Sequence, residues 1–141
     1  MSNLLVQNIK HTNNTTAQTI DTSGRTTVSI MNNDSTFRSD GGAVTQNLVQ
    51  GIAKVWAKCD EHTIEDSFNV TSSTDEGTGL YTITIANDMQ RVEYSLTISS
   101  LADQTGIKAM ATGSYRRECS NSSGTAVDVN FVNSTVHGDL A

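Results

Sequence analysis

The stretch Leu80-Tyr-Thr-Ile-Thr-Ile-Ala86 decides the fold class of this chain of 141 residues. An aromatic side chain and two isoleucines alternate in it with threonine. Alternation with a period of two is typical of a β-strand that buries one of its faces. The segment 93–99 repeats the pattern, with Tyr94 at the start of its apolar side. Both segments are therefore predicted to be half-buried strands.

Four further segments have the composition of strands, namely 49–60, 63–71, 107–118 and 126–137. Val55, Ala57 and Cys59 share one side of the first segment, which predicts a buried face of small side chains. In the last segment Val127, Val129 and Phe131 are in phase. The intervening Ser72–Gly79 is rich in turn formers and is predicted to be a turn.

About six short strands separated by Gly, Asn and Asp turns predict an all-β protein, an antiparallel β-sandwich resembling a jelly roll. The composition agrees, because Ser, Thr and Asn together number 48 and proline is absent. Apolar residues make up 35% and charged residues 17% of the chain. The sequence has room for a single domain of ordinary size with an appendage.

Composition also excludes several classes of protein. No apolar run approaches the 18 or so residues of a membrane span, so membrane insertion is not expected. The formal net charge of -6 argues against a nucleic-acid partner. Two cysteines, Cys59 and Cys119, give neither a disulfide framework nor a zinc motif, and whether they pair is left open. The start Met1-Ser-Asn lacks the pattern of a signal peptide, which predicts synthesis in a cytoplasm.

Charge divides the chain into two parts. Residues 1–48 carry three basic and three acidic side chains, so the whole -6 lies in 49–141. We expect residues 1–48 to form an extended N-terminal β arm, with a hairpin near Ser23 and a polar linker over 32–42. An arm with so little apolar content needs a partner to lie on. The residues we expect to anchor it are Leu4, Leu5, Val6, Ile9 and Ile20.

The expected head, 49–141, carries a sequence of motifs over 50–87. A Gly-Ile-Ala-Lys-x-Trp strand is followed by Asp-Ser-Phe-Asn-Val and then by Asp-x-Gly-Thr-Gly-x-Tyr-Thr-Ile. This order resembles a module of tail-fibre and related appendage proteins of tailed bacteriophages, especially those of marine and cyanobacterial hosts. The ending Val136-His-Gly-Asp-Leu-Ala141 and the early Thr19-Ile-Asp-Thr-Ser-Gly-Arg25 are also similar to segments of such proteins.

The resemblance implies a virion structural protein, a homotrimer with a β-rich distal domain. Its arm would attach to other virion proteins of the tail or capsid, and its head would contact the host surface. Family members often have a longer shaft, so the position on the particle stays open. A tail fibre or fibre tip is the first interpretation, and a capsid decoration, cement or head-fibre protein is the alternative. A stand-alone carbohydrate-binding module is a second functional class.

Aromatic side chains are the candidate contact residues. Tyrosines on strands are mostly packing residues whose hydroxyl reaches water. They are nevertheless the candidates for contact with a host glycan, namely Tyr81, Tyr94 and Tyr115. Trp56, Phe68 and Phe131 are expected in the core or in a subunit interface.

Catalytic, metal and cofactor sites are not expected. The acidic pair Glu65-Asp66 would point to opposite faces of a strand, and no nucleophile or phosphate-loop motif occurs. Asp75-Glu76-Gly77 is expected to be a solvated turn rather than a calcium site. The basic pair Arg116-Arg117 is expected at a salt-bridged strand position.

Overall fold

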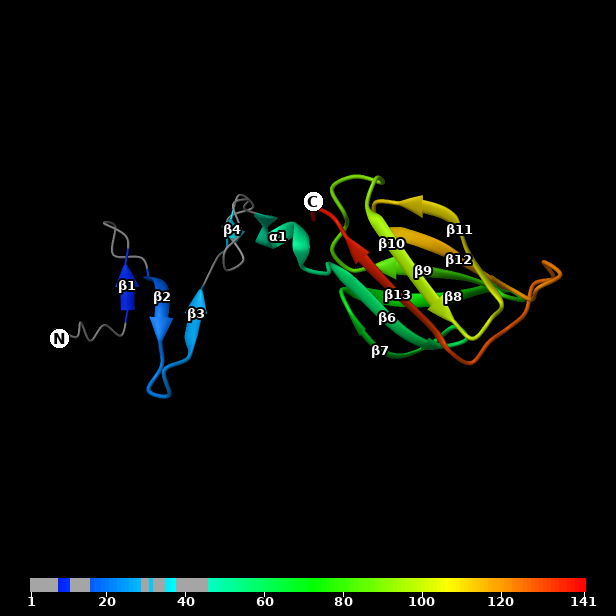
Figure 1. Ribbon diagram of the computed structural model, residues 1–141, viewed down its shortest axis with the longest axis horizontal. Helices are drawn as coiled ribbons and strands as arrows, with labels where there is room; N and C mark the ends of the chain where they lie inside the picture. The colour runs from blue at the N-terminus through cyan, green and yellow to red at the C-terminus, as the bar shows by residue number, and fades with distance from the viewer. Residues whose placement is uncertain (1–7, 11–15, 29–30, 32–34, 38–45) are drawn as a thin grey trace. The chain divides into compact units, whose positions relative to one another are not determined.

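The computed structural model describes residues 8–10, 16–28, 31, 35–37 and 46–141 (Figure 1). The chain divides into two compact units, Met1–Val49 and Gln50–Ala141, called below the N-terminal unit and the head. The division lies one residue from the boundary predicted from the charge distribution. Among the described residues no helix is long and apolar enough to cross a membrane.

The N-terminal unit contains a three-stranded antiparallel sheet in the order β1 (Asn8–Lys10), β2 (Thr16–Ile20) and β3 (Thr26–Val28). The hairpin predicted near Ser23 is confirmed, because β2 and β3 pair across it. Asp21 closes its turn by accepting the backbone N–H groups of Ser23 and Arg25 at 2.8 and 2.9 Å. A second pair joins β4 (Thr36–Phe37) to β5 (Gln46–Asn47).

The head is an antiparallel sandwich of two four-stranded sheets, which confirms the predicted fold class. Sheet C has the order β10-β13-β6-β7, and its strands are β10 (Ser95–Ser100), β13 (Val132–His137), β6 (Val55–Asp60) and β7 (Thr63–Phe68). Sheet D has the order β11-β12-β9-β8, and its strands are β11 (Gln104–Ala111), β12 (Ser114–Ser120), β9 (Leu80–Ile85) and β8 (Val70–Gly77). Consecutive strands β6–β7, β8–β9 and β11–β12 form hairpins within one sheet.

Several element boundaries differ from the prediction. The first strand of the head begins at Val55, because a helical turn, α1 (Leu48–Gly51), occupies the start of the expected strand. The segment 72–79 was expected to be a turn, but most of it belongs to β8, where pairing with β9 overrides its turn-forming composition. The segment 107–118 is two strands rather than one, joined at Thr112 and Gly113.

The predicted phase of the last strand is wrong. β13 begins only at Val132, and its buried side chains are Val132, Ser134 and Val136. The apolar residues at 127, 129 and 131 lie in the connection that precedes it. Pairing with β6 on one side and β10 on the other sets the register of β13, and a shift of one residue exchanges the two faces.

Two strands follow the predicted alternation. On β6, Val55, Ala57 and Cys59 are buried and the residues between them are exposed. On β9 the buried residues are Tyr81, Ile83 and Ile85. Small side chains of sheet C therefore face large side chains of sheet D across the core.

Asn69 forms the corner at which the chain passes from sheet C to sheet D. It is the one residue between β7 and β8, and its φ is 58°, a conformation that asparagine tolerates better than most residues. Its Nδ2 donates to the carbonyl oxygens of Lys54 and Asn87, both at 3.1 Å. Its Oδ1 accepts the backbone N–H of Asn87 at 2.7 Å. The corner thus joins the start of β6 to the end of β9.

Replacement of Asn69 by alanine is expected to lower the free energy of unfolding by about 2–4 kcal/mol. The change removes these side-chain hydrogen bonds, at about 0.5–1 kcal/mol each because most are solvent-exposed, and leaves at positive φ an alanine, which tolerates that conformation less well than asparagine by up to about 1 kcal/mol. Denaturant unfolding of the full chain measures the change. Asn69→Gly relieves the backbone and is expected to be less destabilising; an Asn69→Ala midpoint equal to wild type would contradict the corner's role.

Candidate functional site

The three tyrosines that sequence analysis placed at a glycan surface are buried, so that prediction is corrected. The Tyr81 hydroxyl donates to Asp128 Oδ1 at 2.8 Å, and the Tyr115 hydroxyl pairs with Ser134 Oγ at 2.5 Å. The Tyr94 hydroxyl lies 3.1 and 3.0 Å from the carbonyl oxygens of Ala111 and Ser114, both at the β11–β12 turn. A polar tip with a partner lets each ring serve as a core residue.

Arg117 lies next to these tyrosines and has no exposed surface. Its Nη1 and Nη2 donate to the carbonyl oxygens of Val132 and Glu61, each at 3.3 Å, and its guanidinium lies over the Tyr81 ring, 5.6 Å from the centroid. Its Nε has no hydrogen-bond partner, and Arg117 forms no ion pair with any described residue. The expected salt-bridged position is thus wrong for Arg117 but confirmed for Arg116, which pairs with Glu76 at 3.4 Å.

The two cysteines are free thiols inside the same core. Neither has any exposed surface. Burial raises the pKa of the Cys119 thiol, so it is less readily converted to the reactive thiolate. The pairing that sequence analysis left open is absent.

Trp56 and Phe68 instead lie on the outer face of sheet C, Phe131 lies in the connection before β13 next to Lys58, and this trio is called below the aromatic face. Their exposed fractions are 36%, 53% and 37%. Trp56 on β6 stands directly opposite Phe68 on β7, and Phe131 covers Lys58, whose Nζ is 6.0 Å from the ring centroid. These residues are therefore not part of the core of the head. Whether they form a subunit interface stays a prediction.

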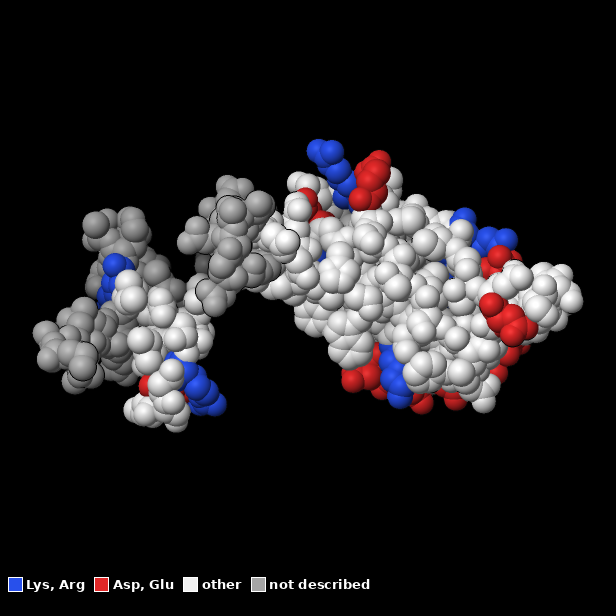
Figure 2. Space-filling model, viewed as in Figure 1, with Lys and Arg blue, Asp and Glu red and all other residues white. Residues whose placement is uncertain are grey.

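Charged groups also lie on this face, because Lys58 and Asp66 stand opposite each other on the same side as Trp56 and Phe68. Lys58 pairs with Glu65 at 2.7 Å, and Figure 2 shows a mostly uncharged surface over β10 and β13 with acidic side chains gathered at its margins. On the outer face of sheet D, Lys108 pairs with Glu118 at 2.8 Å. Exposed pairs of this kind add little stability, so their main effect is on which surfaces can meet.

The N-terminal unit also has an apolar face. Ile9 stands opposite Gln18, which stands opposite Val28, so the three share one side of the sheet. Ile20 is two residues beyond Gln18 and lies on that same side. Ile9 is 49% and Val28 50% exposed. The other expected anchor residues, Leu4, Leu5 and Val6, lie outside the described residues.

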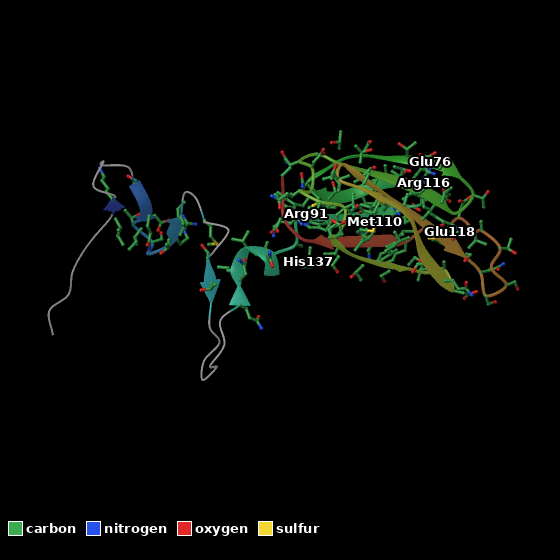
Figure 3. The ribbon with its side chains drawn as sticks, turned by 90° about the horizontal axis from the view of Figure 1, so that it is seen from above. Glu76, Arg91, Met110, Arg116, Glu118 and His137 are labelled. Atoms are coloured by element: carbon green, nitrogen blue, oxygen red, sulfur yellow. The ribbon has the colours of Figure 1, made fainter. Side chains whose placement is uncertain are left out.

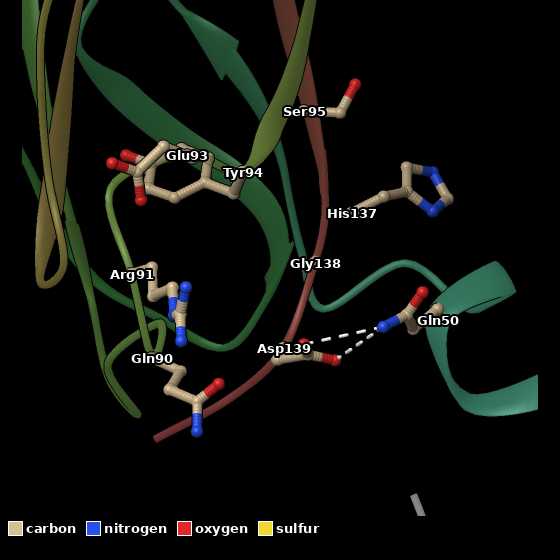
Figure 4. A pocket seen from close by; sticks show the side chains of 9 residues that line it. All are labelled: Gln50, Gln90, Arg91, Glu93, Tyr94, Ser95, His137, Gly138 and Asp139. Atoms are coloured by element: carbon tan, nitrogen blue, oxygen red, sulfur yellow. Dashed lines mark hydrogen bonds between the residues drawn. The ribbon is translucent and has the colours of Figure 1, made fainter. Parts of the chain in front are cut away.

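A polar pocket of about 360 Å³ lies at one end of the head, beside the segment that follows β13 (Figure 4). Figure 3 shows two of its residues, Arg91 and His137, at that end, with Glu76, Arg116 and Glu118 farther along. Asp139 accepts from Gln50 Nε2 at 3.3 and 3.4 Å. Gly138 is needed behind the pocket, since a Cβ there would lie 3.0 Å from Met89 Cε and from Tyr94 Cβ.

The pocket combines donors and acceptors suited to a hydroxyl-rich ligand. Gln90, Arg91 and His137 offer amide, guanidinium and imidazole groups, while Glu93 and Asp139 offer carboxylates. Arg91 forms no ion pair with the residues described, which leaves its guanidinium available for a carboxylate. Sequence analysis missed this pocket, because its residues come from three segments that no motif connects.

The same pocket holds a serine and a histidine. Ser95 and His137 are opposite each other in the β10–β13 pairing, but the Ser95 hydroxyl points away from the imidazole (Figure 4). The contact that activates a serine nucleophile is therefore not made.

Within the described part of the chain no three His, Cys, Asp or Glu side chains gather in a way that would hold a metal ion. At the expected solvated turn, Asp75 accepts the backbone N–H of Gly77 at 2.9 Å.

Comparison with known proteins gives no match: no protein-family model, no curated protein and no solved structure matches the chain. The likeness of the head to phage tail-fibre modules stays a prediction.

The buried tyrosines predict an unusual alkaline titration. Burial raises the pKa of all three hydroxyls, that of Tyr115 to about 12, and in Tyr81 the bond to Asp128 raises the pKa further. The fold favours the neutral hydroxyl, so this stabilisation is complete below the ordinary pKa of about 10 and is lost as the pH rises through the folded-state values.

Tyrosinate absorbance, recorded together with circular dichroism, measures this titration. The chain contains three tyrosines, all of them buried, so we expect no tyrosinate signal near pH 10 while the fold persists. In denaturant the same chain should titrate near its ordinary pKa of about 10. A titration near pH 10 in the folded protein would show that at least one ring is accessible.

Proposed function

We propose that this chain is a bacteriophage virion structural protein, a tail-fibre or fibre-tip component that assembles as a homotrimer. The observation that carries the proposal is that both units present apolar side chains on an outer sheet face. In the N-terminal unit these are Ile9, Ile20 and Val28, and in the head they are the aromatic face. The motif order over 50–87 resembles that of tail-fibre modules, and this resemblance is the reason for proposing a phage protein.

The N-terminal unit is suited to attachment. A three-stranded sheet of short strands is stable only when its apolar face packs on something, and no described residue of this unit covers Ile9 or Val28. Its formal charge of zero keeps the approach to another virion protein free of net repulsion. We infer that this face packs on the tail or capsid protein that receives the chain, in a virion assembled in the host cytoplasm.

The head is suited to self-assembly. Aromatic side chains are enriched in subunit interfaces and charged side chains are depleted from interface centres. The aromatic face fits the first part of this description, since Trp56 and Phe68 adjoin. Lys58 and Asp66 lie beside them, and the Lys58 charge is paired with Glu65. In a trimer with a three-fold axis, each of the three copies would bury its own Trp56, Phe68 and Phe131.

The alternative within the same class is a capsid decoration or cement protein. The small head and an N-terminal unit with an exposed apolar face would also suit a protein that covers a junction of capsid subunits. Purified chain added to capsids depleted of it would raise their resistance to heat in this case. A fibre component would leave that resistance unchanged.

Light scattering on the full chain tests the assembly. We expect a mass three times the 15.1 kDa of one chain, or a multiple of that trimer. The double variant Trp56→Ser and Phe68→Ser should lose the trimer, because it removes the apolar centre of the face. Val92→Ser, which changes a side chain of similar exposure away from the face, is the matched control. A monomeric wild type, or a trimer unaffected by the double variant, would reject this interface.

Contact with a host glycan is a second role, favoured by the polar pocket. We propose that Arg91 binds the carboxylate of an acidic sugar while neighbouring amides bind its hydroxyls. On an array of acidic glycans Arg91→Ala should weaken binding about tenfold or more, since a hydrogen bond to a charged group contributes about 1.5–3 kcal/mol. Lys108→Ala removes another exposed cation, outside the pocket, and should bind like wild type. Equal binding by both variants, or no binding by the wild type, would contradict this role.

A further inference from the structure

Strand β10 differs from the other three edge strands of the sandwich. The edges are β10 and β7 in sheet C and β11 and β8 in sheet D. Register shifts interrupt the pairing of β7, β8 and β11, and each of these strands carries charge, Glu65-Asp66, Asp75-Glu76 and Lys108 respectively. β10 reads Ser-Leu-Thr-Ile-Ser-Ser, has no charged residue, and pairs with β13 without a shift.

Bulges and charges are the usual means by which proteins prevent edge strands from pairing with other chains. An edge strand presents a row of N–H and C=O groups on its open side, and β10 lacks both protective features. It is therefore the edge of this head to which another strand can add most easily.

The sequence of β10 is complementary to itself in one antiparallel register. When Thr97 of one copy stands opposite Thr97 of the other, Leu96 meets Ile98 and Ser95 meets Ser99. Apolar side chains then extend the inner side of the sheet on both copies, and hydroxyl side chains form a ladder on the outer side. A shift of two residues in one direction would place Leu96 opposite Ser100, and the same shift in the other direction would place Ile98 opposite Tyr94, outside β10.

A groove of about 410 Å³ runs between β10 and β11 and is open to a second chain. Leu96, Ile98 and Ile107 line it. Leu101, just after β10, is 75% exposed, the largest exposed fraction among the large apolar side chains of the described residues. Pairing at β10 would bring the partner's leucine and isoleucine side chains to this groove.

Charge permits a second copy of this chain at β10, where no carboxylates would meet. The sequence assigned to the head has a net charge of -6, so two copies repel each other wherever their acidic edges meet. At β7 and β8 self-pairing would juxtapose carboxylates, whereas at β10 it juxtaposes none. A second copy of this chain therefore fits the uncharged β10 better than it fits the acidic edges β7 and β8.

We propose that β10 pairs antiparallel with β10 of a second copy, with Thr97 on the two-fold axis, and joins two sheets C into one of eight strands. The contact is separate from the aromatic face and would link trimers in pairs. The contact is isologous, so one pair of β10 strands closes on itself, and two trimers form a closed pair when the three two-fold axes cross the three-fold axis at right angles.

Thr97→Cys in the full chain tests this geometry. Residues opposite each other on an antiparallel pair have Cβ atoms about 4.5–5.5 Å apart, close to what a disulfide spans, so mild oxidation should give a linked dimer. Thr135→Cys, directly opposite Thr97 on β13 within one copy, is the matched control. The native cysteines are buried and do not compete. We expect cross-linking about tenfold faster or more for Thr97→Cys than for Thr135→Cys.

Register is tested by mixing two variants. Ser95→Cys and Ser99→Cys should each cross-link poorly alone and well when mixed, because residues 95 and 99 oppose each other across the axis. Thr97→Lys should abolish the contact by bringing two ammonium groups together, while Thr135→Lys retains it, as measured by mass. Circular dichroism confirms that each variant is folded.

Equal cross-linking of Thr97→Cys and Thr135→Cys would overturn the proposal, and cross-linking of Ser99→Cys alone at the rate of Thr97→Cys would overturn the register. Trp56→Ser with Phe68→Ser should leave the Thr97→Cys link intact. The two interfaces therefore fail independently.

Discussion

The head depends on hydrogen bonds that large side chains of sheet D make with sheet C across a narrow core. Tyr115 on β12 reaches Ser134 on β13, and Arg117 on β12 reaches the carbonyl oxygen of Val132. Sheet C makes room for them with small residues such as Ala57 and Cys59. A buried guanidinium without an ion pair is expensive, so the position of Arg117 is stable only while both carbonyls and the Tyr81 ring are in place.

This arrangement explains how a chain with 35% apolar residues builds a sandwich. Tyrosine and arginine contribute bulk to the core, and their polar atoms find partners within it, Arg117 Nε excepted. Tryptophan and phenylalanine are consequently not needed inside, and Trp56, Phe68 and Phe131 lie on the surface. The usual distribution is partly reversed, with polar-tipped residues inside and apolar ones outside. Surfaces of that kind are typical of proteins that work as parts of assemblies.

The two units present different means of contact. The N-terminal unit offers a small apolar sheet face, whereas the head offers an aromatic face, an uncharged edge strand and a polar pocket. Acidic side chains lie on the edges β7 and β8 and at the margins of the surface over β10 and β13. The negative charge thus limits which surfaces of two copies can approach.

The sequence by itself determined the all-β class, the half-buried strands at 80–85 and 95–100, the small buried side of β6, and the hairpin at Ser23. These features are local, because a period of two or a turn former fixes them over a few residues. It did not determine the phase of β13, the strand character of 72–77 or the inward direction of Arg117. Pairing with β6 and β10 sets the phase of β13, and pairing with β9 makes 72–77 a strand. Pairing with β9 and β11 sets the direction of Arg117. The pocket around Arg91 and the contrast among the four edges likewise arise only in the tertiary structure, since both compare residues that are distant along the chain. A strand's alternation predicts that it has two faces, but only its neighbours decide which face is inside.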